Sequence, residues 1–177
     1  MKSAIFTSGF HAYQVSNIIY AGPVQEIPEE RRRNGSTHSF KVLTALGAAY
    51  CYYKDVESAR KARGALGAML DTLRPNAFKH GNEYVDPKSV VSFSYVRQFK
   101  KPVEECTHGF VVTMLTSDEK NRDVWIRYRS EEHARKGRKV MWAALHSANG
   151  LTASARQDDD GQPVAQEAPV ASDSVPF

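Results

Sequence analysis

The chain has 177 residues, of which 41% are hydrophobic, 10% aromatic and 25% charged, a composition typical of a folded domain rather than a disordered or fibrous protein. No apolar run approaches the roughly 20 residues that cross a bilayer, and the N-terminal residues lack the pattern of a secretion signal. Cys51 and Cys106 form neither a metal-ligand spacing nor a disulfide framework. These features exclude a transmembrane or disulfide-stabilised protein, and we expect a cytoplasmic one.

The net charge of +4 is unevenly distributed along the chain. Residues 150–177 contain one arginine and five acidic residues, a net charge of −4, which leaves +8 for residues 1–149. A body this basic is expected to meet a polyanion, although the same charge would also serve simply to keep it soluble. Segment 150–177 has few residues that could form a core, so we predict a disordered acidic tail.

In the first half of the body, β-branched and aromatic residues predict strands over Val15–Tyr20, Phe40–Leu46 and Ala48–Tyr53. Asp55 is a favourable N-cap for a helix, which should end before Pro75. The apolar residues of this helix recur at helical spacing: Leu66, Met69, Leu70 and Leu73.

The second half repeats this order. Strands are predicted over Val90–Phe99, Phe110–Leu115 and Val124–Arg129. Ser130 is the N-cap of a second helix, which should end at Asn149 and Gly150. Its apolar stripe consists of Ala134, Met141, Ala144, Leu145 and Ala148.

The two halves are also similar in sequence. Residues 53–70 align without gaps on residues 128–145, at an offset of 75. Upstream the similarity is weaker: residues 16–20 resemble 89–93, and residues 40–42 resemble 110–112. A gene duplication explains this pattern most economically. We predict an α+β fold with repeats at about 13–75 and 86–149, in which an antiparallel sheet carries both helices on one side.

Alternation along the strands predicts a functional face. In the last strand, Val124, Ile126 and Tyr128 should point into the core. The opposite face then carries aromatic and basic residues in both repeats: Trp125, Arg127 and Arg129, and at equivalent positions Tyr50, Tyr52 and Lys54. Aromatic rings interleaved with cations suit unstacked bases and their phosphates, with stacking worth about 1–3 kcal/mol per base. The alternative is that a partner subunit or loops cover these rings.

Further basic clusters could extend this surface. Arg31, Arg32 and Arg33 lie in a predicted hairpin or loop, and Arg97, Lys100 and Lys101 end a strand; such positions often hold phosphates, although the arginine triplet is equally consistent with a solvated turn. The helical bases are assigned to solvated faces: Arg60, Lys61, Arg63, Arg135, Lys136, Arg138 and Lys139.

Catalytic signals are weak. The sequence has no phosphate-cradling glycine loop, no His-Glu-x-x-His and no Gly-x-Ser-x-Gly. The six histidines are scattered without ligand-like spacing, and Cys106 and His108 have no supporting nucleophile motif. We therefore expect a protein that is not an enzyme and needs no cofactor or metal.

The C-terminus carries a resemblance to a known family. Its acidic, Pro-Phe ending resembles the tail of bacterial and phage single-stranded DNA-binding proteins (SSB), in which the acidic tip docks on replication and repair proteins. The resemblance implies that Asp173, Pro176 and Phe177 bind such partners. The usual run of aspartates is interrupted by Ser174, and the body does not read as that family's five-stranded barrel. Its duplicated layout is closer in architecture to the Whirly-type fold, without a Whirly signature motif.

These observations predict a non-enzymatic single-stranded DNA-binding protein of a phage or mobile element, which recruits replication or repair proteins through its tail. Two alternatives stay open: a protein that sequesters a small anionic nucleotide signal, and a structural or assembly protein whose sheet face is an interface. A repeat-built sheet with open edges often completes itself by oligomerising, so we expect a homo-oligomer.

Overall fold

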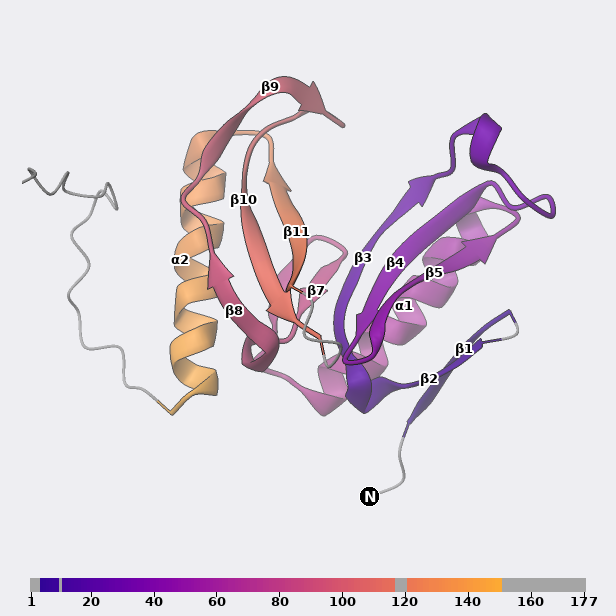
Figure 1. Ribbon diagram of the computed structural model, residues 1–177, viewed down its shortest axis with the longest axis horizontal. Coiled ribbons are helices and arrows are strands. Elements are labelled where there is room, and N and C mark those ends of the chain that lie inside the picture. The colour runs from indigo at the N-terminus through magenta and orange to yellow at the C-terminus, as the bar shows by residue number, and fades with distance from the viewer. Residues whose placement is uncertain (1–3, 10, 117–120, 151–177) are drawn as a thin grey trace, which may run out of the picture.

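The computed structural model describes residues 4–9, 11–116 and 121–150 (Figure 1). The first half comprises β1 (Ile5–Ser8), β2 (His11–Gln14), β3 (Ile18–Glu26), β4 (His38–Thr44), β5 (Gly47–Tyr53) and α1 (Val56–Leu73). The second half comprises β6 (Phe78–His80), β7 (Glu83–Val85), β8 (Val90–Phe93), β9 (Arg97–Val103), β10 (Cys106–Leu115), β11 (Asn121–Tyr128) and α2 (Glu131–Ala148). Within the described ranges, neither helix is long and apolar enough to cross a membrane.

The α+β class, the antiparallel strands and the two helices are confirmed. The strands are divided among three sheets: a five-stranded sheet in the order β5-β4-β3-β7-β6, a four-stranded sheet in which β10 pairs with β11, β8 and β9, and the hairpin β1–β2. Each larger sheet packs one helix on one face (Figure 1). The expected single sheet does not form, because the edge of β3 pairs with the hairpin β6–β7 and strands β8–β11 make a separate sheet.

The helix boundaries agree with the sequence prediction because their signals are local. The Ser58 N–H donates to Asp55 Oδ1 at 2.7 Å, and the His133 N–H donates to Ser130 Oγ at 3.3 Å. These caps satisfy backbone donors that the first helical turn leaves free. The buried stripe differs in part: Leu66 and Leu70 are buried, whereas Met69 and Leu73 are exposed.

The long strand predicted over Val90–Phe99 is interrupted. Residues 90–93 form β8 and residues 97–103 form β9, and both pair with β10. At the break, the Val111 N–H donates to Ser94 Oγ at 2.9 Å. A side-chain acceptor bonded to β10 at this point marks a local irregularity between the two paired segments. Similarly, residues 15–17 form a 3-10 turn and β3 begins at Ile18.

The two halves correspond more completely than the sequence indicates. Each begins with a hairpin, and the pairs Phe6 with Tyr13 and Phe78 with Val85 have the same register at an offset of 72. Gly9 and Gly81, at the same place in the two turns, have φ of 57° and 54°, where glycine is favoured. In both halves a 3-10 turn follows the hairpin, and then come strands and one helix. The strands are β3, β4 and β5 in the first half, and β8 with β9, β10 and β11 in the second.

Equivalent contacts recur in the two halves. The Phe40 and Tyr53 rings stack at 5.7 Å, and those of Phe110 and Tyr128 at 6.0 Å. Thr37 Oγ1 donates to the Lys54 carbonyl and Thr107 Oγ1 to the Arg129 carbonyl, both at 2.7 Å.

Strands β3 and β8, which follow the hairpins of the two halves, align at an offset of 72. Ala21 lies opposite Val42, and Phe93 lies opposite Val112. Ala21 is therefore the counterpart of Phe93, whereas the sequence comparison matched Tyr20 to it. The difference matters because a shift by one residue moves every side chain of a strand to the other face.

Two helical arginines are not solvated, contrary to the sequence prediction. Arg63 is 6% exposed and donates to the carbonyls of Ala21, Gly22 and Asn82. Its counterpart Arg138 is half-buried and donates to the Ser94 carbonyl at 3.1 Å. Helical periodicity placed both on the polar face, but their long side chains reach strand carbonyls of the packed sheet. The other helical bases are exposed as predicted: Arg60, Lys61, Arg135, Lys136 and Lys139.

The core consists of two clusters. One lies between α1 and the first sheet and includes Phe40 and Leu66. The other lies between α2 and the second sheet and includes Phe110 and Met141, but it also contains Leu43 from the first sheet. Because the second cluster draws on both halves, it joins them into one body.

Candidate nucleic-acid interface

The predicted alternation of β5 is confirmed. Cys51 is buried in the cluster beneath α1, whereas Tyr50 and Tyr52 are 49% and 56% exposed on the opposite face. Their rings lie 6.3 Å apart. An exposed aromatic pair of this kind offers a surface on which a ligand ring can stack.

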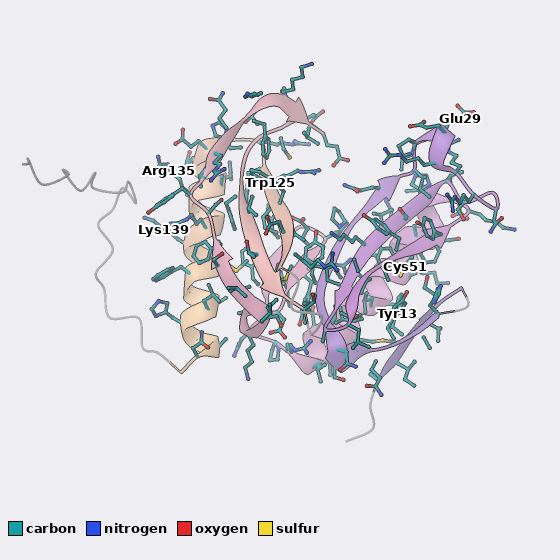
Figure 2. The ribbon with its side chains drawn as sticks, in the orientation of Figure 1. Tyr13, Glu29, Cys51, Trp125, Arg135 and Lys139 are labelled. Carbon is teal, nitrogen blue, oxygen red and sulfur yellow. The ribbon has the colours of Figure 1, made fainter. Side chains whose placement is uncertain are left out.

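The alternation of β11 is confirmed as well. Val124, Ile126 and Tyr128 are buried, and Trp125 and Arg127 lie half-buried on the face away from α2. Figure 2 places Trp125 in the second sheet, away from Arg135 and Lys139 on the outer side of α2. The Phe99 ring of β9 meets the Trp125 ring edge-on at 5.2 Å. Phe99 therefore covers part of the indole, so the chain itself provides some of the cover that the alternative assigned to loops or a partner subunit. The rest of the indole lines a cavity.

That cavity brings the two predicted faces together. It has a volume of about 400 Å³, and Lys41 and Tyr50 of the first sheet line it together with Trp125 and Arg127 of the second. We call it the cleft. Further lining residues were not predicted from the sequence, among them Tyr20, Gln25, His80, Glu83, Glu104, Cys106 and Asp123.

A second hollow adjoins the cleft along β9. It has a volume of about 410 Å³ and shares Trp125 and Arg127 with the cleft. Three predicted bases line it: Arg97, Lys100 and Lys101. Trp125, Arg127 and these three bases of the second repeat therefore form one surface, with the indole in the cleft and the β9 cations at its margin.

Other predicted residues lie apart from the cleft. Arg31, Arg32 and Arg33 are in the connection between β3 and β4, where Arg32 pairs with Glu26 at 2.8 Å. Figure 2 shows Glu29, in the same connection, far from Trp125. Lys54 follows β5 and does not line the cleft, and Arg129 is exposed and pairs with Glu105 at 2.9 Å. The three tail residues predicted to bind partners lie outside the described residues: Asp173, Pro176 and Phe177.

The cleft also contains carboxylates, and Glu83 is the most perturbed. Its Oε1 accepts a hydrogen bond from the Tyr20 hydroxyl at 3.1 Å. Burial raises the pKa of Glu83 to about 7, although the hydrogen bond from Tyr20 and the charge of Arg127 oppose the rise. The charge of the cleft therefore changes around neutral pH.

This pKa predicts a pH-dependent stability. Between the ordinary pKa of 4.5 and about 7, the folded state holds a proton that the unfolded state has lost, so stability falls as pH rises. We expect Glu83→Gln to be more stable than wild type at pH 8, by about 1–3 kcal/mol, and close to it at pH 4. Denaturant unfolding at the two pH values measures this, with Glu29→Gln, an exposed carboxylate in the connection between β3 and β4, as control. A Glu83→Gln effect that is equal at both pH values would contradict the assignment.

A third cavity lies between β6, β11 and α2, beside the cleft. Its volume is about 540 Å³, and its lining includes Arg129, His133 and Lys136. The Tyr128 hydroxyl at its wall is buried and has no hydrogen-bond partner among the described residues. A Cβ at Gly137 would overlap this hydroxyl, so glycine is needed for the tyrosine to lie against α2.

The hairpin β6–β7, which supplies His80 and Glu83 to the cleft, was not predicted from the sequence. A signal was present: residues 80–83 read His-Gly-Asn-Glu, and Gly-Asn between two short apolar segments is typical of a tight hairpin. The His80 ring contacts the Tyr128 ring at 4.0 Å, and burial lowers the pKa of His80. The Lys41 side chain was also missed, although alternation with buried Phe40 and Val42 places it on the face of the cleft.

Comparison with known proteins identifies no relative: no family model, curated protein or solved structure matches this chain.

Proposed function

We propose that the protein binds single-stranded DNA in the cleft and does not act as an enzyme. The observation that carries this proposal is that Tyr50 and Trp125, from different halves of the chain, line one cavity. The basic hollow along β9 adjoins that cavity, because Trp125 and Arg127 line both.

The arrangement suits a single strand better than a duplex. The bases of an extended strand have free faces and can stack on Tyr50 and Trp125 in the cleft and on Tyr52, which lies beside Tyr50 outside it. A duplex keeps its base faces inside the helix. Arg127 and the cations of β9, which line the adjoining hollow together, would then hold phosphates beside the rings. Stacking recognises every base, so little sequence preference is expected.

The tail completes the proposal. On its resemblance to the SSB family, we propose that Asp173, Pro176 and Phe177 bind replication or repair proteins. The tail's net charge of −4 against the body's +8 would also let it compete with DNA for the basic surface.

Fluorescence anisotropy with labelled oligo-dT tests the binding function. Affinity should rise as the strand lengthens from about 5 to about 40 nucleotides and should be weak for a matched duplex. The logarithm of affinity should fall with the logarithm of salt concentration, with a slope near −0.7 for each phosphate contacted. Absence of binding at low salt, or affinity independent of length, would refute the proposal.

A second candidate function is the binding of a small anionic nucleotide. The observation that favours it is the cavity beside α2, where the buried Tyr128 hydroxyl lies close to several basic side chains. Stoichiometry distinguishes the two functions. A nucleotide pocket saturates at a fixed molar ratio with a mononucleotide and gains nothing from a longer oligonucleotide, and titration calorimetry measures this directly.

A further inference from the structure

The two halves of the chain are joined by strand pairing. The β6–β7 hairpin of the second half adds to the edge of the first sheet, with Val85 opposite Tyr20 and Tyr84 opposite Ala21. The Asp86 N–H continues the pairing by donating to the Ile19 carbonyl at 2.8 Å. The same hairpin also packs on its own half, through the Phe78 ring at 6.5 Å from the Phe110 ring.

The first half carries an equivalent hairpin. In β1–β2 the Phe6 ring lies 6.2 Å from the Phe40 ring, which is equivalent to the contact of Phe78 with Phe110 at 6.5 Å. Among the described residues, however, β1–β2 adds to no further strand, and β8, the counterpart of β3, pairs on its β10 side alone. The chain therefore contains a second hairpin, β1–β2, and a second open strand edge, on β8, but these two do not pair with each other.

Exposure of equivalent residues supports this reading. Ile19 in β3 is 5% exposed, whereas its counterpart Val91 in β8 is 58% exposed. In the hairpins, Tyr84 is buried and its counterpart Ala12 is exposed. Figure 1 shows β1–β2 and β8 on opposite sides of the molecule, so one chain cannot join its own two parts.

The unjoined surfaces are complementary in size. Within the chain, the large Tyr84 lies opposite the small Ala21 and lines one cavity with Gly67 of α1. At the open edge the sizes are reversed. The counterpart of Ala21 is the large Phe93, and the counterpart of Gly67 is the large Trp142. The Phe93 and Trp142 rings meet edge-on at 5.8 Å. The hairpin that fits this edge must carry a small residue at the position of Tyr84, and β2 has Ala12 there.

We propose that a second copy of this chain docks its β1–β2 hairpin on β8 and repeats the internal junction between molecules. The internal register places Gln14 of one copy opposite Val91 of the next, Tyr13 opposite Ser92 and Ala12 opposite Phe93. Added strands of this kind bind through main-chain hydrogen bonds. The interface uses two different surfaces, so copies assemble head to tail into a closed ring or a filament.

Disulfide cross-linking tests the register. Two single variants, Gln14→Cys and Val91→Cys, are prepared in a Cys106→Ser background, where Cys51 is buried. The mixture of the two should form a disulfide-linked dimer under mild oxidation, because paired strand positions have Cα separations within disulfide range. Each variant alone should form no more than the background protein. No dimer in the mixture, or as much in either variant alone, would overturn the proposed register.

Sedimentation analysis tests the interface in the otherwise unaltered full chain. Wild type should self-associate, and both Val91→Lys and Ala12→Tyr should weaken that association by about tenfold or more, through an unpaired charge and a steric clash. Leu46→Lys is the matched control, because Leu46 is 79% exposed and lies outside both surfaces. A monomeric wild type, or variants that associate as strongly as wild type, would overturn the proposal. Neither outcome bears on the cleft, which Ala12 and Val91 do not line.

Discussion

Replacement of Trp125 by alanine is expected to weaken binding of oligo-dT by about 1–3 kcal/mol, or roughly 5- to 150-fold. Trp125 is the largest ring of the cleft and lies between Tyr50 on one side and the β9 cations on the other. Its loss removes a stacking surface but no charge, so the slope of affinity against salt should stay the same. Anisotropy with a mixed-sequence oligonucleotide should give the same loss, because stacking is tolerant of sequence.

Two controls isolate the effect of the cleft. Tyr95→Ala removes a 49%-exposed ring that lies under Arg138, outside the cleft, and should bind as wild type does. The chain has two tryptophans, so Trp142→Phe leaves Trp125 as the single indole, and DNA should quench its fluorescence by stacking. If folded Trp125→Ala bound as tightly as wild type, the strand would not lie in the cleft.

The second large effect is expected on stability, from Arg63→Met. This substitution keeps the apolar stem but removes the donors to the carbonyls of Ala21, Gly22 and Asn82. Two buried acceptors and the half-buried Asn82 carbonyl would lose this donor, and we expect the free energy of unfolding to fall by about 2–4 kcal/mol. Because Asn82 belongs to the β6–β7 turn, the loss should also loosen the junction of the two halves.

The duplication provides a matched control for Arg63. Arg138→Met removes the equivalent side chain, which is half-buried, donates to the Ser94 carbonyl and lies 5.0 Å from the centre of the Phe93 ring. A smaller loss of about 1 kcal/mol is expected there. Denaturant unfolding of both variants measures the difference. Equal losses would show that the extra bonds of Arg63 contribute nothing to stability.

The pH dependence of Glu83 and the effect of Arg63 on stability are connected through the β6–β7 hairpin. Glu83 begins β7, and Tyr84 and Val85 pair with β3. A substitution at Glu83 therefore tests the charge of the cleft, whereas one at Arg63 tests how the hairpin is held. The two substitutions can be combined, since independent sites should give additive changes in the free energy of unfolding and coupled sites should not.

The sequence by itself determined the features that depend on neighbouring residues. Asp55 and Ser130 set the helix starts because an N-cap acts within one turn. The period of two predicted which side chains of β5 and β11 face the core, and the period of 3.6 predicted part of the buried helix stripes, such as Leu66 and Leu70. The offset between the halves likewise revealed the repeat. Tyr50, Trp125 and Arg127 were identified in this way, since alternation along a strand is a local property.

Tertiary structure alone decided how these parts meet. Short strands such as β6 and β7 carry little periodic signal, so neither their place at the edge of β3 nor the contribution of Glu83 to the cleft was predicted. Arg63 belongs on a polar helix face by its spacing and is buried only because strand carbonyls of the packed sheet accept its hydrogen bonds. The separation of Arg31–Arg33 from the cleft has the same origin, because the distance between residues far apart in the chain is set by packing between elements and not by local propensity.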